Sequence, residues 1–578
     1  MRKIILSLVI LLFCGGGYFL WRQSHKKKNT IETIQSLDMD LTLDYHNLDI
    51  DWSTYKTEKI ELSDSIDIQE GGIYILSGTL EDGSITIDTE DYVKLILNQV
   101  SIKNANGPAL YIKNSKATFL SLEEGTENRF EDGSTRTTES EELDGVIYSK
   151  DDLFFEGKGT LYVTSNYQDG IVSKDNIEVT EGVYRIDAKD DGIRGKDSIS
   201  ILGGTFDITA LGDGLKTTNT TDAKKGFILI ENGDFTIEAE NDGMDAETKV
   251  LIQEGTFLIK TGGGSEQAES TSEKPSFSPR ETKVSSNTAS KKGIKAGDNL
   301  VIQGGTFTFD TVDDSIHSNT SIGIKDGEFT ISSGDDGIHA DETLLIEGGN
   351  LSILKSYEGI EASNILIQNG TITIISDDDG MNAASKKDPS NRMEPFQNKN
   401  QMENWLKIYG GVIDVNANGD GIDVNGNGYV YGGEITVDGP SDNGNGALDY
   451  DGEFVVDGGE ISLIGSSGML QGISSSSKQY NITIGFEETY EEKSQIEIID
   501  TEGNNIFSKT ADKSFSSLVF SSNQLQKDHT YTIKINEKEV QTFTITSITT
   551  TVGNVDTMRP RKRGGKENPP QNRPQPMP

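Results

Sequence analysis

Closely spaced aspartates recur at a fixed interval through the middle of this 578-residue chain. The repeated phrase is two acidic residues, a glycine, an aliphatic residue and a polar residue, as at 190–194 and 335–339. Its glycine, here called the pivot glycine, occurs at Gly170, Gly192 and Gly214, an interval of 22 residues. Carboxylates are hard oxygen ligands, and Ca2+ takes about six to eight such ligands, often from turns that also supply carbonyl oxygens. The residue types therefore indicate divalent-cation chemistry.

The residues that directly precede the pivot positions form a set that we call the turn column. The pivot is a glycine except in two coils, where Ser315 and Ala447 take its place. If the interval places successive phrases one above another, these carboxylates lie about 5 Å apart, the spacing of neighbouring strands. Like charges at that distance raise pKa values or require counter-ions. We expect Ca2+ to be the counter-ion, and water with Na+ is the alternative. The turn column comprises Asp169, Asp191, Asp213, Asp242, Lys292, Asp314, Asp336, Glu358, Asp379 and Asp420. The predicted calcium ligands are Asp190, Asp191, Asp213, Asp242, Asp313, Asp314, Asp335, Asp336, Asp378, Asp379 and Asp420.

The residues two positions after the pivot glycines form a second set, the strand column. Its members are Arg194, Lys216, Asp245, Lys295, His317, His339, Glu361, Asn382, Asp423 and Asp449. The alternating signs of Lys216, Asp245 and Lys295 indicate an ionic ladder. His317 and His339 could bind a transition metal, and a partly exposed stacked pair is the alternative. The candidate carbohydrate-binding residues are Arg194, Lys216, Lys295, His317, His339 and Trp405.

The elements that position these columns follow from the interval. A fixed period of this length is typical of stacked-repeat proteins. A second phrase, a glycine with an aromatic or aliphatic residue two positions later, lies about ten residues before the pivots, as at Gly204 and Gly305. This spacing leaves room for short strands and turns but none for helices, so successive strands must pair in parallel, and parallel crossovers are right-handed. We predict an all-β protein, a right-handed parallel β-helix of about 22 residues per coil with a small C-terminal β-sandwich-like cap.

Changes in composition and period suggest the following domains. The repeat is interrupted near 262–290 and near 384–404. We expect the apolar residues at the second interruption, Met393, Phe396, Met402 and Trp405, to form a small satellite core, and a ligand platform is the alternative. The expected segments are an N-terminal signal or anchor at 1–28, a linker at 29–58, the carbohydrate-binding β-helix at 59–475, a C-terminal β domain at 476–553 and a basic, proline-rich, disordered tail at 554–578.

The net charge, the single cysteine and the N-terminal apolar run limit the binding partners and the cellular location that the protein can have. The formal net charge of −42 predicts repulsion of nucleic acid. Cys14 is the only cysteine, so no intrachain disulfide can form. It lies in the apolar run 4–21, which basic residues flank on both sides. About 18 apolar residues can just span a bilayer, so we expect an uncleaved membrane anchor on a monomer whose body lies outside the cell. A form cleaved there, or lipidated at Cys14, is the alternative.

Several ordered motifs together resemble a clostridial cell-surface carbohydrate-binding β-helix family. They include the runs at 71–80, 93–102, 124–128, 149–161 and 190–197, and the resemblance covers about residues 60–550. It implies a pectate-lyase-like fold, calcium binding, and binding of cellulose and acidic polysaccharide without established catalysis. It also implies a place on the cell surface of a Gram-positive-type bacterium. The tail and both interruptions depart from the family pattern.

The residues leave three functions open. The first is a calcium-dependent, non-catalytic module that binds acidic, uronate-containing or cell-wall glycans. The second is an enzyme. In a lyase, Arg194, Lys216 or Lys295 would act as the base that removes a proton beside the uronate. In a glycosidase, paired carboxylates such as Asp335 and Asp336 would hydrolyse the glycosidic bond. The third is a surface stalk or adhesin. Because a catalytic set should occur once whereas the acidic phrase recurs in coil after coil, we favour binding without catalysis.

Overall fold

The computed structural model describes residues 37, 48, 50–137, 142–268, 289–385, 404–553 and 555. The chain divides into two units, residues 1–38 and 39–578, and the account below concerns the second. The predicted anchor, most of the predicted linker, Met393, Phe396, Met402 and nearly all of the predicted tail lie outside the described residues. Among the described residues, no helix combines the length and the apolar character needed to cross a membrane.

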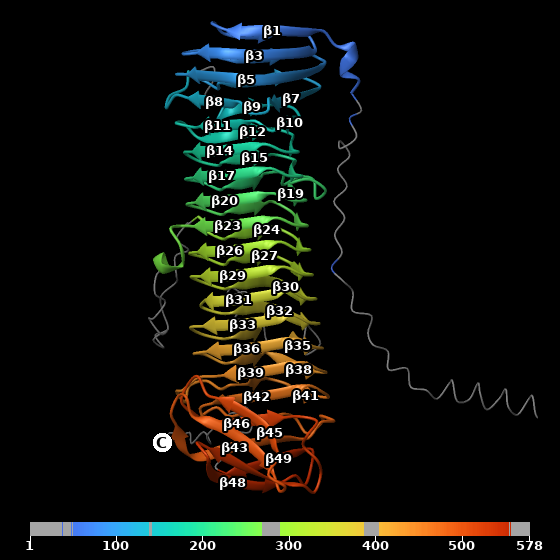
Figure 1. Ribbon diagram of the computed structural model, residues 1–578, viewed down its shortest axis with the longest axis vertical. Coiled ribbons are helices and arrows are strands. Elements are labelled where there is room, and N and C mark those ends of the chain that lie inside the picture. The colour runs from blue at the N-terminus through green and yellow to red at the C-terminus, as the bar shows by residue number, and fades with distance from the viewer. Residues whose placement is uncertain are drawn as a thin grey trace, which may run out of the picture. The chain divides into compact units, whose positions relative to one another are not determined.

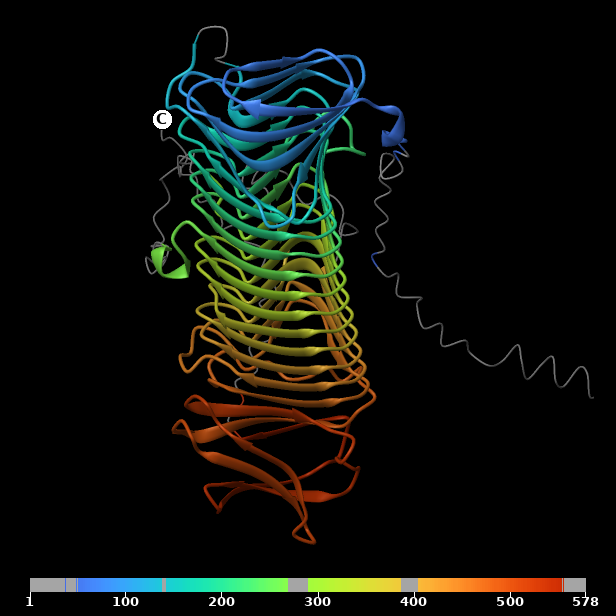
Figure 2. The same cartoon turned by 45° about the horizontal axis from the view of Figure 1, so that its top comes forward.

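The second unit is all-β, and 45 of its described strands form one large, mostly parallel sheet. Short strands follow one another around each turn of chain, and Figures 1 and 2 show these turns lying one below another. The strands align in three faces, each with its own set of parallel pairings. Two short 3-10 helices, η1 (Trp52–Thr54) and η2 (Ser265–Gln267), are the only described helices.

Face one holds the regularly alternating strands. They are β8 (Glu127–Asp132), β11 (Thr160–Thr164), β14 (Val183–Ala188), β17 (Thr205–Ala210), β20 (Asp234–Ala239), β23 (Thr256–Thr261), β26 (Thr306–Thr311), β29 (Glu328–Ser333), β31 (Asn350–Lys355), β33 (Thr371–Ser376), β36 (Val412–Ala417), β39 (Glu434–Asp438) and β42 (Glu460–Gly465). In β17 every second residue is buried, the pattern of a strand with one apolar side against the core.

Face two carries the strand column. Its strands are β2 (Ile66–Ile68), β4 (Ile85–Asp88), β6 (Leu110–Asn114), β9 (Gly145–Ser149), β12 (Asp169–Ser173), β15 (Ile193–Gly195), β18 (Leu215–Thr217), β21 (Met244–Ala246), β24 (Ile294–Ala296), β27 (Ile316–Ser318), the first parts of β30 (Ile338–Ile346) and β32 (Ile360–Ile367), then β34 (Met381–Ala383), β37 (Ile422–Val424) and β40 (Asp449–Tyr450). Each pairs with the face-two strand of the next coil, so that Arg194 lies beside Lys216 and His317 beside His339.

Face three completes each turn. It comprises β7 (Ala117–Leu122), β10 (Leu153–Glu156), β13 (Asn176–Val179), β16 (Ser198–Ile201), β19 (Phe227–Ile230), β22 (Val250–Ile252), β25 (Leu300–Ile302), β28 (Ser321–Ile324), the second parts of β30 and β32, then β35 (Asn404–Ile408), β38 (Gly426–Val430) and β41 (Phe454–Val456). Three longer strands precede these coils: β1 (Thr57–Leu62), β3 (Gly72–Leu80) and β5 (Tyr92–Asn104). β5 pairs with both β7 and β8, and so joins faces three and one.

The interruptions of the repeat leave the register intact. The first lies between β23 and β24, yet Asp245 still pairs with Lys295. The second lies between β34 and β35, yet Asn364 pairs with Trp405. The predicted order of the strand column is therefore confirmed from Arg194 to Asp449.

An aromatic stack runs through the core behind face one. Neighbouring rings lie 4.6–5.0 Å apart between centroids and are nearly parallel. The stack comprises Tyr184, Phe206, Phe235, Phe257, Phe307 and Phe329. These are the aromatic residues of the second repeated phrase, and the glycine before them adopts a positive φ, for example +118° at Gly204, which favours glycine.

The pivot glycines are required by close approach of neighbouring coils. A Cβ atom on Gly359 would lie 2.4 Å from the carbonyl oxygen of Gly380 and 2.3 Å from Cγ2 of Ile374. The corresponding distances at Gly192 are 2.6 Å to the Gly214 carbonyl oxygen and 2.6 Å to the Ile208 methyl. The aliphatic residue that follows each pivot is buried, as predicted, for example Ile193 and Ile360.

The last strands have a core of their own. β43 (Asn481–Tyr490), β46 (Phe515–Ser521) and β49 (Thr549–Gly553) join the large sheet, and β46 pairs antiparallel with β42. A separate four-stranded sheet contains β44 (Gln495–Asp500), β45 (Asn505–Thr510), β47 (Thr530–Ile535) and β48 (Lys538–Thr544). Side chains from both sheets form a second hydrophobic cluster, which includes Ile484, Phe520 and Ile533.

Candidate functional site

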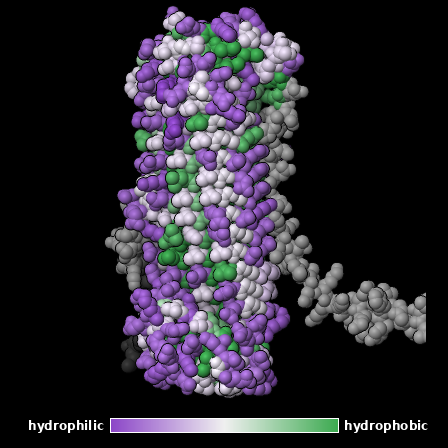
Figure 3. Space-filling view, viewed as in Figure 1, coloured by the Kyte–Doolittle hydropathy of each residue, from purple (hydrophilic) through white to green (hydrophobic). Residues whose placement is uncertain are grey.

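The turn column lies where each coil passes from face one to face two. Most of its aspartates are buried, with 1–5% of Asp242, Asp314 and Asp336 exposed to solvent. The surface in Figure 3 is hydrophilic along both margins, with paler and apolar residues between them. Acidic side chains that are removed from water need hydrogen bonds or positive charges as compensation. The structure supplies these differently in the two halves of the column.

A hydrogen-bond ladder accounts for one oxygen of most turn-column carboxylates. The backbone N–H of Asp191 donates to Oδ1 of Asp169 at 3.0 Å, and that of Asp213 donates to Oδ1 of Asp191 at 2.9 Å. The same bond joins further coils, with acceptors Asp213, Asp242, Asp314, Asp379 and Asp420 and distances of 2.6–3.1 Å. Because a buried amide without a partner is costly, the carboxylates have a structural role in addition to any ligand chemistry.

Lysine replaces the carboxylate of the turn column at one position. The backbone N–H of Lys292 still donates to Asp242 Oδ1, at 2.6 Å. The Lys292 side chain cannot accept a hydrogen bond from the backbone N–H of the next coil. That N–H, which belongs to Asp314, instead donates to Oδ1 of Asp313 at 3.0 Å. The Lys292 ammonium contacts Asp313 Oδ1 at 2.8 Å and Asp314 Oδ2 at 2.7 Å.

Basic members of the strand column neutralise the N-terminal half of the turn column. Arg194 Nη2 lies 2.5 Å from Oδ2 of both Asp144 and Asp169. Lys295 Nζ lies 3.1 Å from Asp245 Oδ1 and 3.5 Å from Asp242 Oδ2. The contact between Lys295 and Asp245 confirms one step of the predicted ionic ladder. The other contacts run between the two columns, and Lys216 pairs with turn-column aspartates instead of Asp245.

Lys216 shows what these ion pairs do to a possible catalytic base. It pairs with Asp213 and lies 3.6 Å from Asp191 Oδ1. Burial acts to lower the pKa of Lys216, but the attraction of Asp213 and Asp191 outweighs it, so the pKa rises. A lysine that holds its proton this firmly is a poor proton acceptor for a lyase reaction.

In the C-terminal halves of the turn and strand columns, the described residues include no such cations. Five carboxylates, here called the C-terminal carboxylate set, have no lysine or arginine ion-pair partner among the described residues: Glu358, Asp379, Asp420, Asp423 and Asp449. Burial, followed by the repulsion of Glu361, raises the pKa of Glu358 to about 8. Burial and the neighbouring carboxylates likewise raise the pKa of Asp379 to about 8 and that of Asp423 to about 7.

The structure gathers most of the predicted site residues into small groups. Donor atoms lie within 4.8 Å of one another in groups that include Asp169–Asp190–Asp191, Asp213–Asp242–Asp245, Asp313–Asp314–Asp335, Asp314–His317–His339 and Asp336–His339–Glu361. Asp190 and Asp335 are exposed, and Asp313 and Asp378 are half-buried. Arg194, Lys216, Lys295, His317 and His339 share face two.

Trp405 does not join the other candidate carbohydrate-binding residues. It lies on β35 of face three, beside Asn364 and Asn427. The ammonium of Lys407 lies 4.5 Å from the centre of its ring. A role in sugar stacking would therefore require a surface separate from the two columns.

Sequence reasoning placed Glu358 and Glu361 in the two columns but left them out of the predicted metal ligands. Their phrase, Tyr357-Glu358-Gly359-Ile360-Glu361, lacks the paired aspartates on which that prediction was based. Column position is the signal that finds them. Asp144 was missed: it precedes Gly145 in an earlier coil, and this single Asp-Gly step does not indicate its contact with Arg194.

We expect the metal-free chain to lose stability as the pH rises from about 5 to about 8. Unfolded carboxyl groups titrate near pH 4, whereas folded Glu358 and Asp379 have pKa values of about 8. Between these values the folded state binds more protons than the unfolded state, so the free energy of unfolding falls with increasing pH. Melting temperatures measured with a chelator across this range test the expectation.

Two glutamate variants, one at a buried position and one at an exposed position, test whether the buried carboxylates cause this loss of stability. Glu358→Gln should flatten the pH dependence, because an amide does not titrate. Glu487→Gln changes an exposed glutamate of β43 and should leave the dependence unchanged. A melting temperature that rises through the same range would contradict the expectation.

Comparisons with known proteins point to one family. A family model described as "Carbohydrate-binding domain-containing protein" matches residues 63–337 and 335–486. A protein of the same description from Acetivibrio thermocellus is 32% identical over 122 residues, which make up 20% of this chain. The match spans 43% of that relative's length. A solved structure, "Structure of the polysaccharide lyase-like protein from C. thermocellum, Gadolinium derivative", is 30% identical and covers 36% of this chain and 91% of its own, with a TM-score of 0.35.

Proposed function

Because this chain belongs to the family of carbohydrate-binding domain-containing proteins, we propose that it binds a polysaccharide with the help of Ca2+ and does not cleave it. The glycans that fit are acidic, uronate-containing or cell-wall polysaccharides. The observation that carries the proposal is the C-terminal carboxylate set, which is crowded, partly buried and without a lysine or arginine partner in the part of the chain that the structure describes. A uronate chain would be repelled by such a surface unless cations lay between them.

The donors around Glu358 fit a calcium ion. Asn382 is 8% exposed, and its Nδ2 donates to Glu358 Oε2 at 2.8 Å. Its Oδ1 is buried and accepts no hydrogen bond from the residues that the structure describes. Together with Asp379 of the next coil, these groups offer carboxylate and amide oxygens, the ligand types that Ca2+ prefers. Glu358, Asp379 and Asn382 would hold the ion, which would supply positive charge toward a glycan carboxylate.

The proposal includes a finer description of the fold and of its place in the cell. The 22-residue register and the three parallel faces support a right-handed parallel β-helix, since parallel crossovers take that hand. The C-terminal strands would form its cap. The apolar, positively flanked N-terminal run supports a membrane anchor, with the body of the protein on the outer side of the membrane. A monomeric state is part of the proposal.

Binding of polygalacturonate to the purified chain, measured by calorimetry with Ca2+ and with a chelator, tests the function. We expect binding only with Ca2+. The double variant Glu358→Gln/Asp379→Asn should weaken it at least about tenfold, a loss of about 1.4 kcal/mol. The control Glu328→Gln/Asp234→Asn neutralises two exposed carboxylates of face one and should bind as the parent does.

Three other results of these binding experiments would contradict part or all of the proposed function. Equal binding in chelator would remove Ca2+ from the proposal. Appearance of unsaturated uronate products, seen by their ultraviolet absorbance, would make the protein a lyase. Absence of binding to acidic and neutral cell-wall glycans alike would leave the surface stalk.

A further inference from the structure

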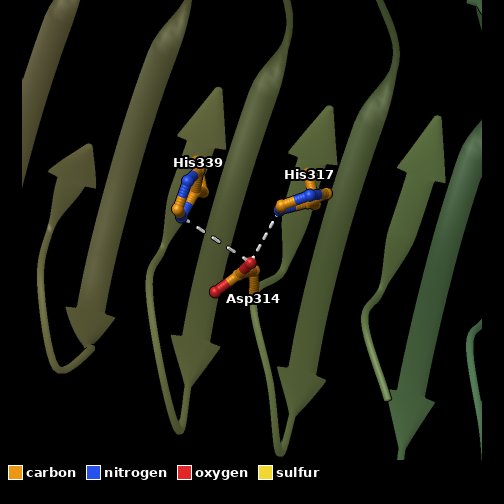
Figure 4. A group of neighbouring side chains, drawn as sticks. All are labelled: Asp314, His317 and His339. Carbon is orange, nitrogen blue, oxygen red and sulfur yellow. Dashed lines mark hydrogen bonds and ion pairs between the residues drawn. The ribbon is translucent and has the colours of Figure 1, made fainter. Parts of the chain in front are cut away.

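Two buried histidines meet on one carboxylate in the middle of face two. His317 on β27 and His339 on β30 lie side by side, with ring centroids 4.9 Å apart, and 5% and 7% of their surfaces are exposed. Figure 4 shows both rings directed at Asp314 from neighbouring strands. Nδ1 of His317 lies 2.8 Å from Asp314 Oδ2, and Nδ1 of His339 lies 3.9 Å from the same oxygen.

Further carboxylates approach His339 Nδ1. Asp336 Oδ2 lies 2.8 Å away and Glu361 Oε2 lies 3.1 Å away. Among the described residues, the lysine in contact with this group is Lys292, whose ammonium approaches Asp314 Oδ2 from the preceding coil. Within the described part of the chain, carboxylates therefore outnumber the lysines and arginines that contact the two imidazoles and their partners.

The second ring nitrogen of each histidine already has an acceptor. Nε2 of His317 lies 3.1 Å from Oδ1 of Asn319, and Nε2 of His339 lies 3.3 Å from Oδ1 of Asp341. A neutral imidazole carries a single N–H. If that proton is on Nε2, each Nδ1 directs a lone pair toward carboxylate oxygens, which is unfavourable unless a positive charge lies between them.

That positive charge could be a second proton on each ring or a metal ion. Two imidazolium rings in contact would repel each other, whereas one divalent ion between the Nδ1 atoms serves both. Zn2+ binds imidazole nitrogen and carboxylate oxygen at about 2.0–2.2 Å in a tetrahedron, which places neighbouring ligand atoms about 3.3 Å apart. The measured separations of 2.8, 3.1 and 3.9 Å bracket that value.

We propose that Asp314, His317, His339 and a carboxylate from Asp336 or Glu361 form a binding site for a transition-metal ion of the Zn2+ class. Asn319 and Asp341 accept the Nε2–H of the two rings, the arrangement by which ligating histidines are usually oriented. Glu361 and Asp341 are about 20% and 29% exposed and leave a route from solvent. The histidine nitrogens distinguish this site from the all-oxygen donors at Glu358, since imidazole suits Zn2+ and Ca2+ prefers oxygen.

Titration of the full chain with Zn2+ in an excess of Ca2+, together with the visible absorption of bound Co2+, tests the site. We expect one Zn2+ per chain and a Co2+ spectrum typical of nitrogen and oxygen ligands. His317→Gln/His339→Gln should weaken binding at least about 100-fold, and Glu361→Gln about tenfold if it is the fourth ligand. His529→Gln replaces an exposed histidine of the C-terminal strands and should have no effect.

Results against the proposal are equally distinct. Zn2+ binding that survives both histidine changes, or that Ca2+ displaces completely, would overturn it. So would failure of the parent chain to bind Zn2+ or Co2+, with nitrogen NMR showing both rings doubly protonated. The Co2+ spectrum of the parent chain remains informative even if the double variant fails to fold. Polysaccharide binding is measured separately, so failure of the proposed function leaves this test unaffected.

Discussion

Replacement of Phe257 by alanine is expected to lower the free energy of unfolding by about 3–5 kcal/mol. Phe257 is 1% exposed, and its ring lies between those of Phe235 and Phe307 at 4.9 and 4.6 Å. Removing the ring loses its burial and leaves a cavity that flanking coils cannot close, because their backbones are fixed by strand pairing on both sides. The stack would also be cut into two shorter parts.

Urea unfolding followed by circular dichroism, with hydrogen exchange of amides in β20, β23 and β26, measures the loss and its extent along the stack. Leu258→Ala is the matched control. Leu258 is the next residue of the same strand, points outward and is 49% exposed, so its loss should stay within about 0.5 kcal/mol. Similar losses at the two positions would contradict the role given to the aromatic stack.

Replacement of Lys292 by alanine is expected to lower the free energy of unfolding by about 3 kcal/mol, the lower end of the range found when one partner of a buried ion pair is removed. The Lys292 side chain is 13% exposed and the Asp314 side chain 3%. Burial acts to raise the pKa of Asp314, but His317 and Lys292, with His339, hold it below its usual range. Without the ammonium, a buried carboxylate would lose part of its compensation.

The same urea measurement compares Lys292→Ala with Arg185→Ala. Arg185 pairs with Asp207 at 2.8 Å, but both side chains are about half exposed, and such pairs contribute less than about 1 kcal/mol. Adding Asp314→Asn to Lys292→Ala should restore part of the stability, because it removes the uncompensated charge. A loss at Lys292 no larger than that at Arg185 would count against the buried pair.

The sequence predicted the register of face two because the pivot glycines leave little freedom. A Cβ atom at Gly359 would collide with the next coil, so the phrase can lie only where coils approach most closely. Its 22-residue spacing then places Arg194 beside Lys216 and His317 beside His339. Counting from the glycines gave most of both columns, and the 22-residue interval supplied the coils in which Ser315 and Ala447 replace the glycine.

The contacts that turn-column side chains make were beyond sequence reasoning. Whether Asp169 accepts a backbone N–H, pairs with Arg194 or does both depends on the path of the turn, which the spacing does not specify. Lys292 illustrates the reason: it breaks the acidic pattern, yet its backbone N–H continues the ladder because that donor belongs to every residue except proline. The predicted metal ligands remain predictions, since their carboxylates have structural partners that explain part of the column.

The antiparallel pairing of β46 with β42 sets the length of the assembly. A stack of identical parallel coils has no intrinsic end. Its last strand is an edge strand, and it exposes the same backbone hydrogen-bond donors and acceptors with which every earlier strand pairs. A second molecule could then continue the stack and polymerise into a fibre. Because β46 runs in the opposite direction to β42, it occupies the edge that the last strand of face one would otherwise offer to a second molecule.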